Sequence, residues 1–403
     1  MADCEQFTVT AKDVDQTLKK VQDEVISGVV SETFTMAAAP CRSGLAIPSE
    51  IASLSSLEPK HAVVLDPLTH PGWDSLVEAH PGSSIFHSRA WARVLHETYR
   101  HRPFYFCRLA NGQLKELLAV MEVSSPWTGA RGVSLPFSDF CGMLRTAEAD
   151  GARLYNLALE TGRQRKWRYL ECKSNHRDWS GSSPAVVFYG HVIDLDRRLQ
   201  TILDGFQSAT RRSLRRAEAA GLHITFDNSL RSMRTFYSLH SLTRRRHGLP
   251  PPGFGFFEKI SRHVLAPGHG FIVTAYAGDL PVAAAVYFHQ GRRAIFKFGA
   301  SDYAFQNLRP NNLVMWEAIK RYAVDGFTSL HLGRTSVANK GLRRYKLGFG
   351  AREERIEHCR FDFRKCAFTR QSHRVHERFC GVFRCLPFPL FRLAGRIIYP
   401  HIA

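Results

Sequence analysis

The sequence lacks long apolar runs, and its first 60 residues contain no basic start followed by an apolar stretch. We therefore expect neither a signal peptide nor a membrane anchor there. Acidic and small polar residues dominate this segment, which predicts a loosely ordered N-terminal extension over residues 1–60.

The sequence also lacks any CxxC pair, and its nine cysteines are an odd number in a chain too long to need disulfides. This pattern is typical of the reducing cytoplasm. A possible set of zinc ligands consists of Cys366, His373, His376 and Cys380, but their spacings differ from those of the usual short ligand pairs. We expect no metal site.

Acidic residues are scarce beside basic ones, 36 against 55, which gives a formal net charge of +19. An anionic partner is expected: nucleic acid, a nucleotide pyrophosphate or an acidic membrane face. The composition is otherwise that of a globular protein, 44% hydrophobic and 23% charged, and 403 residues exceed one usual core. Two packed domains with tails are therefore predicted.

The most informative stretch spans residues 294–350. An alternating, aromatic-rich strand is predicted over residues 294–300, a helix over 311–326 and a second strand over 327–333. Pro310 and Gly326 mark the two helix ends, and a basic loop is expected over residues 334–350.

The start of that helix is a candidate anion site formed by Arg309, Asn311 and Asn312. Free backbone N–H groups and the helix dipole attract anions there. Most helix starts in α/β proteins bind nothing, however, so both interpretations stay open.

Two parts of the chain repeat one order of elements. A hairpin predicted over residues 104–123 precedes Ser138-Asp139-Phe140, a helix over 152–164 and a strand over 167–172. Strands over residues 271–288 likewise precede Ser301-Asp302-Tyr303 and the elements already described. We interpret this as an internal duplication, with domains at residues 61–200 and 201–362.

Two further segments are strongly basic. Arg211 and Arg215 stack at helical spacing, as do Arg212 and Arg216, which favours either phosphate contact or a solvated helix face. Residues 363–403 form a basic amphipathic tail, in which arginines alternate with large apolar residues. The tail could lie on an anionic membrane or pack back on the second domain.

Several motifs, in this order, resemble the Fem-type (FemAB-like) transferases of the GNAT acyltransferase superfamily over about residues 60–362. They are Thr210–Gly221, Lys297-Phe-Gly-Ala-Ser301, Arg309-Pro-Asn-Asn312 with Trp316-Glu-Ala318, Leu332-Gly-Arg334, Gly341-Leu-Arg-Arg-Tyr-Lys346 and Gly348-Phe-Gly350. The resemblance implies a mixed α/β (α+β) fold of two tandem GNAT-like halves, each a mostly antiparallel sheet with flanking helices. It also implies acyl or aminoacyl transfer to an amine, without metal or covalent intermediate.

Glycine is absent from residues 307–312, where acyl-CoA-dependent members carry a glycine-rich run around the pyrophosphate. We therefore expect no bound cofactor and aminoacyl-tRNA as donor, with acyl-CoA as the alternative. The acceptor would be an amine of a cell-envelope precursor, such as a nucleotide-linked or lipid-linked sugar, handled in the cytoplasm or at the inner membrane face. Alternatives are an acyl-CoA-dependent N-acyltransferase of exopolysaccharide biosynthesis and a non-catalytic RNA-binding protein.

Lys346 lies where Fem-type transferases carry a lysine after an aromatic residue, so it is the candidate for stabilising negative charge on the reacting carbonyl. It could instead be a surface cation of a basic loop. Asp302 and Tyr345 are candidates for the base that removes the proton of the attacking amine, and Asp139 and His331 are further candidates. Arg334 and Arg343 are candidate phosphate ligands.

Overall fold

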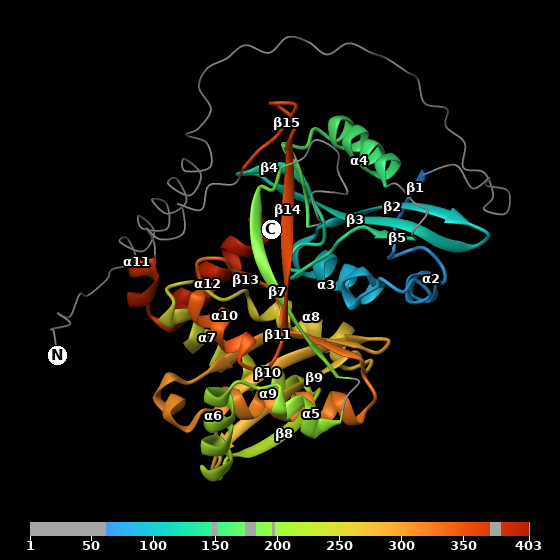
Figure 1. Ribbon diagram of the computed structural model, residues 1–403. Coiled ribbons are helices and arrows are strands. Elements are labelled where there is room, and N and C mark those ends of the chain that lie inside the picture. The colour runs from blue at the N-terminus through green and yellow to red at the C-terminus, as the bar shows by residue number, and fades with distance from the viewer. Residues whose placement is uncertain (1–61, 147–150, 174–182, 196–197, 371–379, 403) are drawn as a thin grey trace.

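A computed structural model describes residues 62–146, 151–173, 183–195, 198–370 and 380–402 (Figure 1). The predicted extension over residues 1–60 lies outside the described residues. The first described strand, β1 (Ala62–Leu65), lies where the sequence predicts the start of globular order.

The first half of the chain is built on an antiparallel meander. Strands β1, β2 (Arg102–Ala110), β3 (Gln113–Ser125) and β4 (Gly129–Val133) pair in sequence order, and the predicted hairpin turns at Asn111 and Gly112, both in the left-handed region. Helix α4 (Ala152–Gln164) then leads to β6 (Tyr169–Cys172), which pairs parallel to β4. The shorter elements are α2 (Trp73–Glu78), η1 (Ile85–His87), α3 (Arg89–Tyr99) and β5 (Leu144–Arg145).

The second half repeats this order. Strands β8 (His223–Asp227), β9 (Gly270–Ala277), β10 (Leu280–Gln290) and β11 (Arg293–Ser301) form the meander, and α9 (Pro310–Val324) leads to β12 (Ser329–His331), parallel to β11. The predicted duplication into tandem halves is thereby confirmed. The accompanying helices are α5 (Leu199–Asp204), α6 (Ser208–Ala219), α7 (Leu230–Arg246), α8 (Phe254–Ile260), η3 (Ser261–Leu265) and η4 (Tyr303–Leu308).

Two long strands are exchanged between the halves. Strand β7 (Val186–Asp194) follows β6 in sequence but pairs with β12 of the second half, whereas β14 (Arg352–Asp362) follows β12 but pairs with β6. The two strands also pair with each other, from Arg352 opposite Val192 to His358 opposite Val186. They join the halves into one sheet, in which both run lengthwise between the two meanders (Figure 1). A domain boundary at residue 200 stays a prediction.

The predicted basic loop over residues 334–350 is wrong in its middle, because residues Lys340–Leu347 form helix α10. The Asn339 side chain caps this helix by accepting a hydrogen bond from the Leu342 N–H. The helix is short and polar, so the surrounding chain rather than its own periodicity stabilises it. Two short strands flank the region, β13 (Thr335–Ser336) and β15 (Ala367–Phe368).

The halves also share a hydrophobic core. Trp91 on α3 is fully buried, and its ring centroid lies 6.1 Å from that of Phe256 on α8 and 5.9 Å from that of Phe288 on β10. Aromatic pairs at these separations add to the free energy gained by burial. The site described below therefore lies between two rigidly joined parts.

The tail forms helices α11 (Cys380–Cys385) and α12 (Phe388–Ile398) and a final turn, η5 (Tyr399–His401). Phe391 is fully buried, and Arg131 donates a hydrogen bond to the His401 carbonyl oxygen, 2.6 Å away. The described tail thus packs back on the protein, while Leu393 and Ile397 remain exposed. None of the helices in the described ranges has the length and apolar content needed to span a bilayer.

Candidate active site

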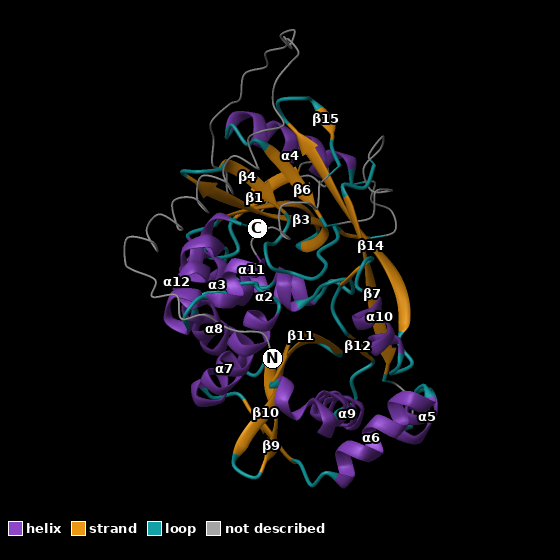
Figure 2. Ribbon diagram, turned by 90° about the vertical axis from the view of Figure 1, so that its left-hand side faces the viewer, coloured by secondary structure: helices purple, strands orange, loops and turns teal. Residues whose placement is uncertain are grey.

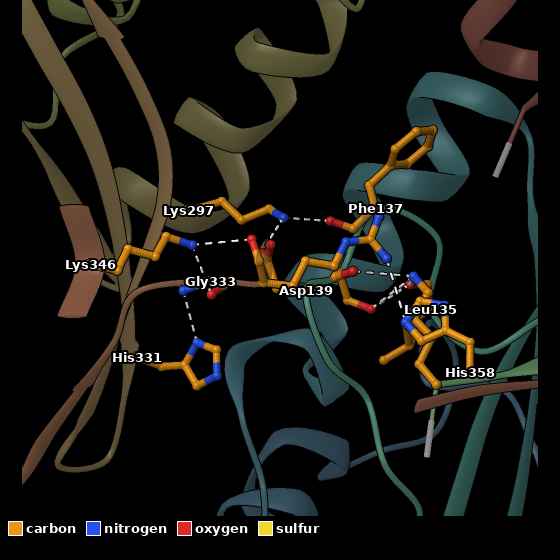
Figure 3. A network of polar contacts seen from close by, with 11 residues as sticks. Leu135, Phe137, Asp139, Lys297, His331, Gly333, Lys346 and His358 are labelled. Atoms are coloured by element: carbon orange, nitrogen blue, oxygen red, sulfur yellow. Dashed lines mark hydrogen bonds and ion pairs between the residues drawn. The ribbon is translucent and has the colours of Figure 1, made fainter. Parts of the chain in front are cut away.

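An ion pair joins the halves beside the exchanged strands. Lys297 on β11 lies 2.6 Å from a carboxylate oxygen of Asp139, and it also donates to the Phe137 carbonyl oxygen, 2.6 Å away (Figure 3). Burial alone would raise the pKa of Asp139, but the Lys297 charge outweighs it and holds the pKa below its usual value. The carboxyl group is therefore ionised.

Lys346 on α10 points toward the same place (Figure 3). Its side chain is buried, and its ammonium donates hydrogen bonds to the carbonyl oxygens of Gly333 (3.0 Å) and Arg334 (3.1 Å). Burial lowers the pKa of Lys346 to about 8, and nearby Asp139 opposes that shift. The interpretation of Lys346 as a surface cation is wrong, because only 3% of the residue is exposed.

Gly333 allows the two halves to approach closely here. Its φ of 71° lies in the left-handed region, and a Cβ atom would lie 3.3 Å from both Asp139 Oδ1 and the Phe296 carbonyl oxygen. A side chain would be strained by the backbone conformation and crowded by these atoms. Glycine therefore places the carbonyl that binds Lys346 beside the carboxylate that binds Lys297.

A third buried lysine, Lys173, binds the loop of residues 135–139, which also binds Lys297 through the Phe137 carbonyl oxygen. Lys173, directly after β6, donates to the Leu135 carbonyl oxygen (2.8 Å) and to the carbonyl and hydroxyl oxygens of Ser138 (both 3.2 Å). Burial and then the Arg334 charge lower the pKa of Lys173 to about 7. Arg334 itself lies over the Phe188 ring, 4.6 Å from its centroid.

These side chains leave an excess of positive charge, which we call the cation cluster: Lys173, Lys297, Arg334 and Lys346 around Asp139. Neighbouring carboxylates are already paired, Glu171 with Arg360 (2.6 Å), Glu353 with Arg343 (2.6 Å) and Glu354 with His331 (3.1 Å). Among the described residues, cations therefore outnumber carboxylates in this buried site, and such an excess attracts an anion or a carbonyl oxygen that gains negative charge.

His331 is held by hydrogen bonds at both ring nitrogens. Its Nδ1 accepts from the Gly333 N–H (2.9 Å), so the neutral ring carries its proton on Nε2, which lies 3.1 Å from Glu354 Oε1. With Nδ1 occupied, His331 orients Gly333 in this structure rather than accepting a substrate proton.

Asp302 and Tyr345 occupy structural positions. Asp302 caps η4 by accepting from the Ala304 N–H, 2.9 Å away, as an aspartate in a turn does. The Tyr345 hydroxyl donates to the Asn311 carbonyl oxygen (3.0 Å), and burial raises the pKa of Tyr345 well above its usual value. This hydrogen bond and the raised pKa both argue against Tyr345 as a general base. Consecutive helical residues diverge by about 100°, so Tyr345 and Lys346 face different surroundings.

The start of α9 is tied into the fold. Asn311 donates from its side chain to the Ser301 hydroxyl (3.0 Å), and the Asn312 N–H donates to the Arg309 carbonyl oxygen (3.0 Å). Arg309 is exposed, with a left-handed φ of 58°. Of these residues, Arg309 has the side chain best placed to meet a soluble anion.

Arg343, Arg211 and Arg215 differ in their freedom to bind phosphate. Arg343 makes two hydrogen bonds to Glu353 (2.6 and 2.8 Å) and stacks on Tyr189, so a phosphate would have to compete with that carboxylate. Arg211 donates to the Asp204 carbonyl oxygen (2.9 Å), whereas Arg215 is exposed on α6. The outer face of α6 is cationic as predicted, and its role in binding stays a prediction.

Sequence reasoning missed Lys173, Lys297 and His191 as members of the site. His191 on β7 is completely buried, and burial followed by the Lys346 charge lowers its pKa to about 4. The available signal was a lysine within or directly after a strand that is otherwise apolar and aromatic, as at Lys297 and Lys173. Such a lysine must find a buried partner, which only the folded chain identifies.

Comparison with known proteins agrees with this fold. Residues 205–347 match the family model "Acetyltransferase (GNAT) domain". The crystal structure of FemX is similar to this chain with a TM-score of 0.60 and 13% identity, over 74% of this chain and 96% of that one. The structure of L-PGS from Bacillus licheniformis is more distant, with a TM-score of 0.49 and 12% identity over 82% of this chain and 98% of that one, and we draw nothing from it. No curated protein matches the sequence.

The chain therefore carries a GNAT acyltransferase domain in its second half and is an acyltransferase. Its overall fold is similar to that of FemX, which confirms the fold that the resemblance to Fem-type transferases implies.

Proposed function

We propose that this enzyme transfers an amino acid or other acyl group from a carrier to an amine of a cell-envelope precursor, at the cation cluster. The observation that supports this most directly is Lys346, a buried ammonium held by two backbone carbonyls beside Asp139. A positioned cation in a site shielded from water stabilises an oxyanion far better than one at the surface.

The reaction would be direct attack. The amine nitrogen bonds to the donor carbonyl carbon, the carbonyl oxygen gains negative charge near Lys346, and the bond to the carrier then breaks. The proton lost by the amine passes to the leaving group, directly or through water. Asp139 would hold Lys297 and the loop of residues 135–139 in place, because its carboxylate is already engaged by Lys297.

Aminoacyl-tRNA is the donor we favour. The segment before α9 has no glycine, so its side chains would crowd a pyrophosphate wrapped by backbone. Exposed cations at Arg309 and along α6 would suit the phosphates of a polynucleotide. Acyl-CoA, acting in exopolysaccharide biosynthesis, is the second candidate, and a non-catalytic RNA-binding protein the third. Location in the cytoplasm or at the inner membrane face belongs to the same proposal.

A comparison of donors tests the proposal. Aminoacyl-tRNA, uncharged tRNA and acetyl-CoA would each be measured for their effect on the melting temperature and for transfer to an amine acceptor. We expect aminoacyl-tRNA to raise the melting temperature and support transfer, since a ligand that binds the native state stabilises it. Transfer from acetyl-CoA alone would establish the second candidate. Binding of both tRNA forms without transfer would refute catalysis with this donor and favour the RNA-binding alternative.

A further inference from the structure

A groove of about 800 Å³ lies between helices α3, α7, α8 and α12, and none of its lining residues belongs to the cation cluster. These four helices gather on one side of the molecule (Figure 2). The volume is within the range of sites that bind small molecules. Because the tail helix α12 forms one wall, the groove exists only when the tail is docked.

The charged residues that line this groove are all cationic. Arg234, Arg392 and Arg396 are among the lining residues, and none of the lining residues is an aspartate or glutamate. Arg392 is partly engaged, donating to the Ser241 hydroxyl (3.3 Å) and stacking on Tyr237. Arg234 and Arg396 are exposed and can reach a ligand. An anionic group is therefore the complementary ligand.

Thr98 and Tyr99, at the end of α3, line the groove, but their hydroxyl groups are buried. Within the described part of the chain, neither Thr98 Oγ1 nor Tyr99 OH makes a hydrogen bond, although both atoms are inaccessible to solvent. Because these two hydroxyls have no solvent-accessible surface, the arginines rather than the hydroxyls are the polar groups that the groove offers to a ligand. The remaining walls include the apolar side chains of Phe254, Pro389 and Leu393.

The exposed surface beside the groove is apolar. Leu393 is 42% exposed and Ile397 is 40% exposed, and their spacing of four residues puts them on one face of α12, next to Arg396. Arginines flanked by outward apolar side chains are typical of a helix that lies in the interface of an anionic membrane. A soluble anion would account for the arginines but not for this apolar face.

We propose that the groove binds an anionic phospholipid at a membrane surface. Arg234 and Arg396 bind the phosphate, and the acyl chains leave over Leu393 and Ile397 into the bilayer. This inference is independent of the proposed donor and acceptor, and it assigns the tail a role in forming a lipid site.

The test is sedimentation of the whole chain with vesicles of phosphatidylcholine alone or mixed with phosphatidylglycerol. We expect binding only to the mixed vesicles, and about thirtyfold weaker binding for the Arg234→Ala/Arg396→Ala double variant, which removes two surface charges. The matched control is Arg212→Ala/Arg216→Ala on α6, which removes equal charge from another exposed surface and should change binding less than about twofold.

Two further arms distinguish the source of the phosphate. Leu393→Asn keeps every charge and should still weaken vesicle binding severalfold, whereas free glycerol phosphate should not displace the vesicles. Equal losses in the groove and α6 variants would show general attraction of a basic protein to an anionic surface and overturn the proposal. Displacement by glycerol phosphate, or no vesicle binding at all, would also overturn it.

Discussion

Lys346 combines a buried ammonium with two acceptors that are both neutral carbonyls. Neutral acceptors satisfy its N–H groups without cancelling its charge, so the ammonium can still stabilise an anion. Burial brings its pKa to about 8, close enough to neutrality for the charge to be lost under mildly basic conditions. The same burial that strengthens its effect on an oxyanion therefore limits the pH range in which it acts.

The first prediction concerns this charge. Lys346→Met should cut turnover by about a hundredfold while leaving donor affinity nearly unchanged, because it removes an interaction made in the transition state. In the native enzyme, the contribution of Lys346 to turnover should be full below its pKa and fall as pH rises through about 8, as the ammonium loses its proton. Steady-state kinetics across this range provide the measurement.

Lys340→Met is the control for this prediction, since Lys340 lies on the same helix but is exposed. It should leave both turnover and the pH profile intact. If Lys346→Met raised only the Michaelis constant of the donor, in a manner that depends on salt, Lys346 would be a phosphate ligand and not a stabiliser of the oxyanion.

The second prediction separates structure from catalysis at Asp139. Asp139→Asn leaves Lys297 buried without its counterion, which should lower the free energy of unfolding by about 3–5 kcal/mol. Adding Lys297→Met should restore much of that loss, because no unpaired charge remains. Urea unfolding of the two single variants and the double variant measures this coupling. Strictly additive losses would contradict the ion pair as the reason for Asp139.

At the scale of residues, the sequence predicted a cation as the stabilising group of the site, but it identified only some members of the cation cluster. Lys346 was found through a motif and Asp139 through the repeated tripeptide, and both lie in the cation cluster. Lys173 and Lys297 were missed because their partners are backbone carbonyls and a carboxylate from distant parts of the chain. Spacing along one strand does not reveal such partners.

At the scale of elements, the sequence predicted the central strands of both meanders and the helices α4 and α9. The predicted helix over residues 152–164 is α4 itself, and the helix predicted to follow Pro310 is α9, since the signals for these elements are local. Helix α10 and the pairing of β7 with β12 were not predicted. Their stability comes from contacts with distant residues, which periodicity does not encode.

The third prediction tests how α12 is seated. A Cβ atom at Gly395 would lie 1.8 Å from the Pro251 carbonyl oxygen, a backbone atom that cannot move without shifting the segment before α8. Gly395→Ala should therefore displace α12 and lower the free energy of unfolding by about 1–3 kcal/mol. Thermal unfolding and limited proteolysis of the tail would detect this change.

Gly381→Ala provides a matched control in the same tail, because a Cβ atom there meets nothing within 4 Å. It should be neutral or slightly stabilising, since alanine favours helix over glycine. Equal sensitivity of the two variants to protease would show that α12 is not fixed by its contact with Pro251.

For the whole molecule, the exchange of β7 and β14 makes each half depend on the other. The sheet of the second half ends at β12, and the strand that covers this edge, β7, comes from the part of the chain before residue 195. An uncovered strand edge exposes unpaired backbone groups and promotes aggregation. The GNAT domain of residues 205–347 therefore does not include β7, the strand that pairs with the edge of its sheet at β12.

The last prediction follows from this dependence. A fragment of residues 62–197 should co-purify with one of residues 198–370 when the two are expressed together, because β7 of the first pairs with β12 and β14 of the second. Shortening the first fragment to residues 62–185 removes β7 and should reduce capture, although the pairing of β6 with β14 and the shared core around Trp91 are retained. Expressed alone, residues 198–370 should be largely insoluble. A monodisperse, folded monomer of that fragment would show that the second half is autonomous and that the strand exchange is not needed for folding.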